Sequence, residues 1–301
     1  MTSDPFTDAG VSLSPLEGGW SGETFVAEAG GERTVVRIFA HPRHHPAAAE
    51  IIASLLRLVR GLVPVPEVRE VRRADPDAGT PALLVTELLS GARGDLLLPK
   101  LDDDALRVVG AEVGRVAATL AGMPTLRSGT WADGDLRIES FDLGGLPGYV
   151  EQHRDRLPRW DAADLDRLLT VADEAQALLD AVPRTSVVHS DLNPKNLLVD
   201  PDALTVTGVL DWEFSHSGHP FTDLGNLLRF DRQPAWVDGV LGGWHDRHPG
   251  DPATALATAR AADLYALVEL AVRAEENPVA ARAHAQLLAI ARAGDLHATA
   301  D

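Results

Sequence analysis

The feature that most limits the fold is a change in the apolar pattern near residue 90. Before that point, short apolar and β-branched runs separated by glycine-containing turns predict strands over 12–16, 24–29, 34–39, 68–73 and 82–87. The stretch 46–60 has apolar residues at helical spacing and predicts a helix between the third and fourth of these strands. We therefore expect the first part of the chain to form a small β-rich lobe.

After residue 90 the apolar pattern is mainly helical. Helices are predicted over 102–121, 146–156, 162–181, 252–276 and 278–293. Short β-branched runs return between 186 and 210. The chain is therefore expected to be α+β and to have two lobes: a β-rich N-terminal lobe over 1–89 and a larger, mainly α-helical lobe over 90–301, joined near 87–91.

The balance of charges bears on the class of partner. The chain has 45 acidic and 27 basic residues, a formal net charge of −18. This charge repels nucleic acids and anionic membrane surfaces, so we expect neither as a partner. A negative charge also aids solubility, and the alternative is a site that attracts cations. Because there is no cysteine, disulfides and thiolate chemistry are excluded.

Targeting signals are not evident in the sequence. Residues 1–10 lack the basic residues and the apolar run of a signal peptide. No apolar stretch approaches the roughly 18 residues that span a bilayer. We expect a cytoplasmic protein, either a monomer or a homodimer.

The segment Val187–Val199 places His189, Asp191 and Asn196 on a loop between two apolar runs, and Asp211 follows at the end of the next run. Phosphoryl transfer requires a carboxylate that orients the attacking hydroxyl and accepts its proton. It also requires oxygen ligands for Mg²⁺ close by. A tight loop that ends in a strand can hold Asp191 and Asn196 on one side. This pattern favours a kinase over a chance Asp- and Asn-rich turn.

With these residues in this order, the chain resembles the aminoglycoside phosphotransferase family, which is related to choline kinases and more distantly to protein kinases. The resemblance implies a protein-kinase-like fold and transfer of the γ-phosphate of a magnesium–nucleotide complex to an alcohol hydroxyl. It implies Asp191 as the catalytic base and Asn196 and Asp211 as metal ligands. It also implies structural roles for His189, within the loop, and for Asp223, whose carboxylate would hold the loop through backbone N–H groups.

Three further residues near the motif need comment. Ser190 stands where the family usually has glycine, and a small side chain is expected to preserve activity. Lys195 is expected either to reach the γ-phosphate or to be solvated. Glu213 has two readings as well, support for the metal ligands or a place on the surface.

The resemblance also assigns nucleotide contacts upstream. In the turn 17–24, Gly19, Ser21 and Gly22 would present free N–H groups to the phosphates, although such a turn is also an ordinary hairpin. Arg37 stands where the best-known kinases have a lysine that grips the α- and β-phosphates, and it keeps the positive charge. Glu50, on the following helix, is the expected ion-pair partner of Arg37, and the alternative is a surface ion pair.

The run 84–91 predicts a strand that ends in a short link. Backbone groups near Glu87 and Leu89 would face the edge of a purine. Such groups do not distinguish the bases, so the expected donor is ATP or GTP.

The C-terminal helices line the acceptor site in this family. Here they carry carboxylates near aromatic rings, which suits an amine-bearing acceptor through ion pairs and cation–π contacts. The candidates for acceptor contacts are Asp231, Trp236, Glu269 and Glu275. The same part of the chain also offers Trp244, Asp263, Tyr265 and Glu276. The segment between Asp211 and Asp223 is too short for a protein-kinase activation segment, so a small cationic acceptor is expected.

An aminoglycoside or related antibiotic is the leading acceptor, which would imply a role in antibiotic resistance. A sugar or an amino-alcohol metabolite is the alternative acceptor. A nucleotide-binding regulator without catalysis is a rival from another class, but the catalytic set of Asp191, Asn196 and Asp211 is present. A metal-dependent hydrolase that uses Asp191 and the nearby histidines is a third reading, and it predicts hydrolysis without nucleotide.

Overall fold

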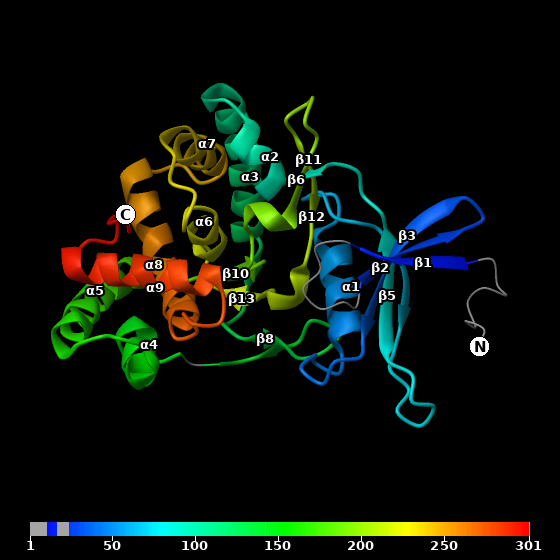
Figure 1. Cartoon of the computed structure of the whole chain (residues 1–301), viewed down its shortest axis with the longest axis horizontal. Coiled ribbons are helices and arrows are strands. Elements are labelled where there is room, and N and C mark those ends of the chain that lie inside the picture. Colours follow the sequence, from blue (N-terminus) through cyan, green and yellow to red (C-terminus); the bar gives the residue numbers. More distant parts are fainter. Residues whose placement is uncertain (1–10, 17–23, 142, 301) are drawn as a thin grey trace. The chain divides into compact units, whose positions relative to one another are not determined.

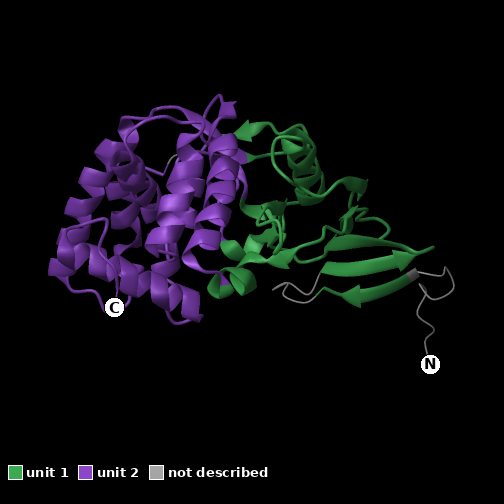
Figure 2. Cartoon of the chain, turned by 90° about the horizontal axis from the view of Figure 1, so that it is seen from above, with its two compact units in different colours: residues 1–100, 131–139, 194–214 green, residues 101–130, 140–193, 215–301 purple. Residues whose placement is uncertain are grey.

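The computed structural model describes residues 11–16, 24–141 and 143–300. The chain divides into two compact units (Figure 2). Unit 1 consists of residues 1–100, 131–139 and 194–214, and unit 2 of residues 101–130, 140–193 and 215–301. The sequence suggested a single boundary near residue 89, whereas unit 1 also takes in two later segments. One of these segments carries Asn196 and Asp211.

Within the described residues, five antiparallel strands form the main sheet of unit 1, in the order β1-β2-β3-β5-β4 (Figure 1). The strands are β1 (Val11–Pro15), β2 (Thr24–Ala29), β3 (Glu32–Phe39), β4 (Val68–Arg72) and β5 (Ala82–Glu87). The first three form the predicted meander, and β5 then pairs with both β3 and β4. The strand that carries Arg37 is therefore hydrogen-bonded on both sides.

A helix, α1 (Ala48–Val59), follows β3 and contacts β4 and β5. Ile51, Ile52, Leu55 and Val59 are buried on it, as expected for an amphipathic helix that covers a sheet. Glu50 lies in its first turn, where a carboxylate interacts favourably with the helix dipole.

A second, smaller sheet of unit 1 positions the two expected metal ligands. Its strands are β6 (Ala92–Arg93), β11 (Leu197–Val199) and β12 (Val206–Val209), in the order β12-β11-β6. Leu197 pairs with Val209, and Leu210 N donates to Asn196 O at 2.8 Å. Because β11 begins just after Asn196 and β12 ends just before Asp211, this pairing brings the two residues together. Short elements complete the unit: α2 (Gly94–Leu97), the 3₁₀ helices η2 (Leu98–Lys100), η4 (Pro194–Asn196) and η5 (Trp212–Phe214), and β9 (Ile138–Glu139), which pairs with β8 (Thr130–Trp131).

Unit 2 is mainly helical. Its helices are α3 (Asp103–Ala121), α4 (Gly145–His153), α5 (Ala162–Asp180), α6 (Thr222–Leu227), α7 (Pro234–His245), α8 (Pro252–Ala271) and α9 (Pro278–Ala293), with η3 (Arg154–Arg156) after α4. Side chains of Asp102, Asp161, Asp251 and Asn277 cap the long helices by accepting a backbone N–H three residues on. A small sheet, β13-β10-β7, is formed by β7 (Pro124–Thr125), β10 (Thr185–Val188) and β13 (His216–Gly218). Among the described helices, none is long and apolar enough to cross a membrane.

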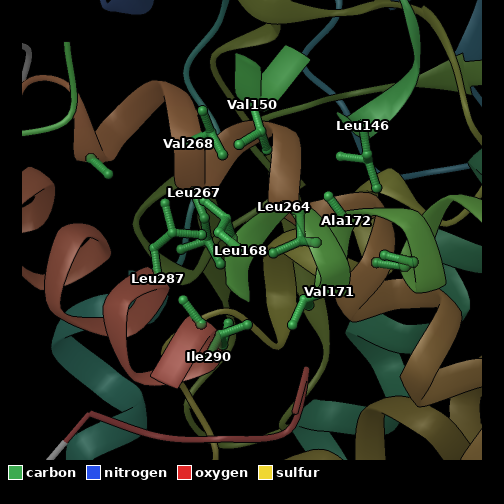
Figure 3. Close-up of a cluster of buried hydrophobic side chains, with 14 of the residues drawn as sticks. Leu146, Val150, Leu168, Val171, Ala172, Leu264, Leu267, Val268, Leu287 and Ile290 are labelled. Carbon is green, nitrogen blue, oxygen red and sulfur yellow. The ribbon is translucent and has the colours of Figure 1, made fainter. Parts of the chain in front are cut away.

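The hydrophobic core of unit 2 lies among α4, α5, α8 and α9 (Figure 3). Leu168 of α5, Leu264 of α8 and Leu287 of α9 are fully buried and converge in this cluster. Burial of such a side chain contributes about 1.5–3 kcal/mol to folding. The helices that carry the candidate acceptor residues therefore rest on a packed core.

Glycines allow α3 and α7 to pack closely. Gly110 and Gly114 on α3 face Gly239 and Gly243 on α7. A Cβ atom on Gly243 would lie 1.9 Å from Ala111 O, and one on Gly114 would lie 2.1 Å from Val240 O. Any side chain at these positions would force the helices apart.

This packing gives a test with a matched control on the same helix. We expect Gly243→Ala to lower the free energy of unfolding by about 2 kcal/mol or more, because it overpacks a helix crossing. A Cβ atom on the adjacent Gly242 meets nothing within 4 Å. We therefore expect Gly242→Ala to be neutral or to stabilise by up to about 1 kcal/mol, through helix propensity. Urea-induced unfolding of both variants measures the difference, and equal values would contradict the close crossing.

Candidate active site

The loop that carries Asp191 begins in unit 2 at the end of β10. His189 is fully buried, and its Nδ1 accepts a hydrogen bond from Asp191 N at 3.2 Å. Asn193 Nδ2 donates to Asp191 Oδ1 at 2.7 Å, which orients the carboxylate. His189 is thus buried within the loop, and the side chain of Asp191 is held in one orientation.

Asp223, in the first turn of α6, holds this loop. Its Oδ2 accepts from His189 N at 2.9 Å, and its Oδ1 accepts from Ser190 N at 2.8 Å. One helical turn later, Asn226 Nδ2 donates to Ser190 O at 3.1 Å. Ser190 has a φ of +68°, a left-handed conformation that is unfavourable for a residue with a side chain. The contacts on both sides of Ser190 explain how a serine is held where the family usually has glycine.

The pKa of Asp223 is raised to about 6, mainly by burial and to a smaller extent by the nearby charge of Asp191. The hydrogen bonds from His189 N and Ser190 N act the other way and only partly offset the loss of hydration. The carboxylate is 1% exposed, so water cannot solvate its charge. Ionised Asp223 therefore depends on the two backbone amides of the loop.

Unit 1 brings together a cation and two carboxylates. Arg37 Nη1 donates to Asp211 Oδ1 at 2.9 Å, and Arg37 Nη2 contacts Glu213 Oε2. Asp211 follows β12 with a φ of +64°, a conformation that aspartate tolerates better than most residues. Arg37 is thus placed beside Asp211, which is a predicted metal ligand.

The predicted ion pair between Arg37 and Glu50 is not the one that forms. Glu50 Oε1 instead forms an ion pair with Arg73, 2.5 Å from its Nε. Glu213 takes the place beside Arg37, because η5 carries its carboxylate to the guanidinium. Glu213 therefore contacts Arg37, and its side chain is 25% exposed.

Asn196 and Asp211 fit a magnesium ion by the chemistry of their donors. Mg²⁺ prefers carboxylate and amide oxygens and takes its other ligands from phosphates and water. Asn196 is 4% exposed. The hydrogen bond from Leu210 N to Asn196 O holds Asn196 close to Asp211, the residue that follows Leu210. No cluster of three or more His, Cys, Asp or Glu side chains that could hold a metal occurs in the described part of the chain. A metal here would therefore need phosphate oxygens as well.

Other predicted nucleotide contacts are placed with less definition. Glu87 N donates to Glu67 O at 2.8 Å, so this amide is already used, and a purine would have to be met by the backbone that follows it. Leu89 lies against Gly208, where an added Cβ would be 2.8 Å from Leu89 Cδ1. Lys195 is half-buried within η4. Gly19, Ser21 and Gly22 lie outside the described residues.

The predicted acceptor residues lie in different environments. Trp236 is fully buried and donates to Leu227 O at 3.0 Å, so its assignment to an acceptor site was wrong. Trp244, which is 1% exposed, is likewise a core residue. Glu269 pairs with Arg273 and Glu275 with Arg159, both at 3.3 Å. Burial raises the pKa of Asp231, and the charge of Arg282 opposes that shift.

Two residues of the loop network were missed from sequence. Asn193 orients Asp191, and Asn226 holds Ser190. The spacing of Asp223 and Asn226 could have revealed the second, because residues three apart lie on one face of a helix. Asp263, which was an acceptor candidate, is buried and bound by Nε and Nη2 of Arg229, so it is not free for an acceptor.

A comparison with protein families decides the classification. Residues 12–257 match the Phosphotransferase enzyme family, APH. The chain belongs to this family. It is a small-molecule phosphotransferase with a protein-kinase-like α+β fold, which confirms the family, the fold class and the enzyme class predicted from sequence.

Solved structures with this fold include kinases of several acceptors. A microcompartment-associated aminopropanol kinase is 21% identical, with a TM-score of 0.66 over 95% of this phosphotransferase and 94% of that chain. An aminoglycoside phosphotransferase in ternary complex with ADP and hygromycin B is 20% identical, with a TM-score of 0.64 over 94% of each chain. A GDP complex of an aminoglycoside 2'-phosphotransferase is 18% identical, with a TM-score of 0.68 over 94% and 92% of the two chains. At these identities the likeness establishes the fold alone.

The curated relatives have different names. Acyl-CoA dehydrogenase family member 11 of Gallus gallus is 30% identical over 119 residues, 35% of this phosphotransferase and 15% of that protein. Acyl-CoA dehydrogenase family member 10 of Mus musculus is 27% identical over 186 residues, 59% of this chain and 16% of that protein. The match therefore covers only a small part of each relative.

The raised pKa of Asp223 predicts a dependence of stability on pH. The pKa is about 6 in the folded chain and 3.8 ordinarily, so the folded state binds this proton more tightly than the unfolded state. The contribution of this group to the free energy of unfolding is full below the lower value and is lost as pH rises through the higher one. The difference in unfolding free energy between wild type and Asp223→Asn should fall by about 2 kcal/mol between pH 4 and pH 7. Urea-induced unfolding at several pH values measures it, and a difference that does not vary with pH would contradict the buried carboxylate.

Proposed function

We propose that this phosphotransferase transfers the γ-phosphate of magnesium-bound ATP or GTP to a hydroxyl of a small, amine-bearing acceptor. The observation that carries the proposal is the fixed Asp191 carboxylate, which Asn193 orients on a loop held by Asp223. In this role Asp191 aligns the acceptor hydroxyl and accepts its proton. A base held in one orientation removes much of the entropic cost of the reaction.

The residues of unit 1 would serve the nucleotide. Asn196 and Asp211 are the residues that would hold Mg²⁺, which when bound neutralises charge on the phosphates. Arg37 supplies a forked cation for phosphate oxygens, and Lys195 a second positive charge. Backbone groups after Glu87 would meet the purine, with Leu89 packed against Gly208. A chain with this set has what catalysis needs, and this argues against a silent regulator.

An amine-bearing acceptor is supported by three observations. The net charge of −18 favours cations. The rings of Tyr149 and Tyr265 meet edge to face with centroids 5.1 Å apart. The pKa of Tyr149 is raised by burial and also by the negative charge of Glu269. A carboxylate near a pair of aromatic rings suits an ammonium group. Solved structures of the same fold include an aminopropanol kinase and an aminoglycoside phosphotransferase with hygromycin B.

A second acceptor class is favoured by a different observation. The curated relatives are named as acyl-CoA dehydrogenase family members, which suggests a hydroxyl on an acyl chain or acyl thioester as the acceptor. Several acidic residues of the C-terminal helices are already paired with arginines, which lowers the negative charge that such an acceptor would meet. The two classes differ in charge, so one acceptor panel separates them.

The test is an acceptor screen that follows ADP or GDP release with Mg²⁺. The panel contains aminoglycosides, amino alcohols, neutral sugars and hydroxyacyl-CoA thioesters. We expect an amine-bearing acceptor to stimulate release and to carry the phosphate, and Asp191→Ala to lower that rate by a factor of about 100 to 10,000. The exposed Asp202 provides a matched control, and Asp202→Ala should keep the wild-type rate.

The other outcomes are equally informative. Stimulation by hydroxyacyl-CoA thioesters alone would replace the first acceptor class with the second. Stimulation by neutral sugars alone would overturn the argument from charge. Nucleotide binding without phosphate transfer in wild type or in Asp191→Ala would favour a regulator. Hydrolysis of a substrate without nucleotide would favour a hydrolase.

A further inference from the structure

Two carboxylates that follow β12 orient the side chain of Arg37. Nη1 donates to Asp211 and Nη2 contacts Glu213. The side chain is only 16% exposed, and its guanidinium carbon lies 5.3 Å from the centre of the Phe39 ring. A cation that is this far from water needs partners that offset its lost hydration. Arg37 therefore has its orientation set by Asp211 and Glu213 together.

The two partners differ in what else they would bind. Asp211 is a candidate ligand of the magnesium ion, so a bound metal would compete with Arg37 for its carboxylate. Glu213 is the middle residue of η5. The indole of Trp212, the residue before it, is buried, and its Nε1 donates a hydrogen bond to Val209 O at 3.0 Å. This anchor fixes the backbone of η5. Glu213 is thus the partner that can stay with Arg37 when Asp211 turns to a metal.

Glu50 does not make the corresponding contact with Arg37. Its carboxylate pairs with Arg73, and the segment 131–139 packs against its base, where an added Cβ on Gly134 would lie 3.1 Å from Glu50 Cβ. Ser54 Oγ, one turn further along α1, donates to Gly134 O at 2.6 Å and holds that segment in place. The carboxylate of α1 therefore faces a different cation.

We propose that Glu213 is the positioning residue that aims Arg37 at the nucleotide phosphates, in place of the carboxylate of α1. Glu213 acts through Arg37 and does not itself touch the nucleotide. The Arg37–Asp211 contact belongs to the nucleotide-free state, and the Arg37–Glu213 contact is kept in both states. This inference rests on the proposed function, because it concerns how the chain binds a nucleotide.

A double-mutant cycle on nucleotide affinity tests the proposal without turnover. The dissociation constants of Mg–ADP and Mg–GDP are measured by calorimetry for wild type, Glu213→Gln, Arg37→Met and the double variant. We expect Glu213→Gln to weaken binding about tenfold in the wild-type background and less than about twofold in the Arg37→Met background. Glu50→Gln should weaken binding less than Glu213→Gln does. Glu70→Gln, which removes an exposed carboxylate paired with Arg72, is the matched control and should bind like wild type.

Several results would overturn the proposal. Equal losses from Glu213→Gln in both backgrounds would show that it does not act through Arg37. A larger effect from Glu50→Gln would return the role to α1. Thermal unfolding identifies a variant that binds poorly because it is misfolded, and Glu213→Asp then serves as a milder second variant, expected to bind better than Glu213→Gln. Wild type that binds neither nucleotide would overturn the proposed function itself, whereas binding by wild type with no coupling would overturn only this inference.

Discussion

The carboxylate of Asp223 accepts two backbone N–H groups, from His189 and Ser190, in a place that water does not reach. An ionised carboxylate is costly to bury unless such donors surround it, and the raised pKa records how incomplete the compensation is. The same two bonds fix the peptides that precede Asp191. The geometry of the base therefore depends on a helix that begins more than thirty residues later in the chain.

Of the five non-glycine residues with a positive φ in the described part of the chain, two lie where a predicted site carboxylate follows a strand. Ser190, just before Asp191, and Asp211 itself both have a positive φ without being glycine. Each is over-determined by neighbours: Ser190 by Asp223 and Asn226, and Asp211 by Arg37 and the backbone bond at Leu210. Strained backbone persists where surrounding contacts pay for it, and it is concentrated at sites that must present a side chain in one direction.

Local pattern was enough to predict most of the fold. Periodicity predicted the bounds of α1, α3, α5 and α9 to within a few residues of those observed. These helices could be predicted because their apolar faces and capping residues are local features of the sequence. The order of β-rich and helical segments then indicated the fold class. The interleaving of the two units was not predictable, since it depends on β6, from the first hundred residues, pairing with β11.

The site divides in the same way. Residues whose roles follow from chain order, such as Asp191 and Asp211, could be proposed from the motif alone. The ion-pair partner of Arg37 could not be predicted from sequence, because Glu50 and Glu213 are both reasonable candidates. In the structure η5 brings Glu213 to Arg37, whereas Glu50 pairs with Arg73. Trp236 was misassigned for a related reason, because an aromatic residue on a predicted helix reads the same whether it faces a ligand or the core.

The charge of the whole chain says less about the acceptor than its size suggests. Asp263, Glu269 and Glu275 each face an arginine, so a large part of the acidic character of these helices is neutralised within the fold. What attracts a ligand is the charge left unpaired at the surface that it meets, and net charge does not report this. Glu269 lies near the Tyr149–Tyr265 pair, and because its ion pair with Arg273 is exposed, an ammonium group can compete with Arg273 for this carboxylate beside the rings. An amine would gain there from both, whereas the thioester of an acyl chain would gain only from the rings.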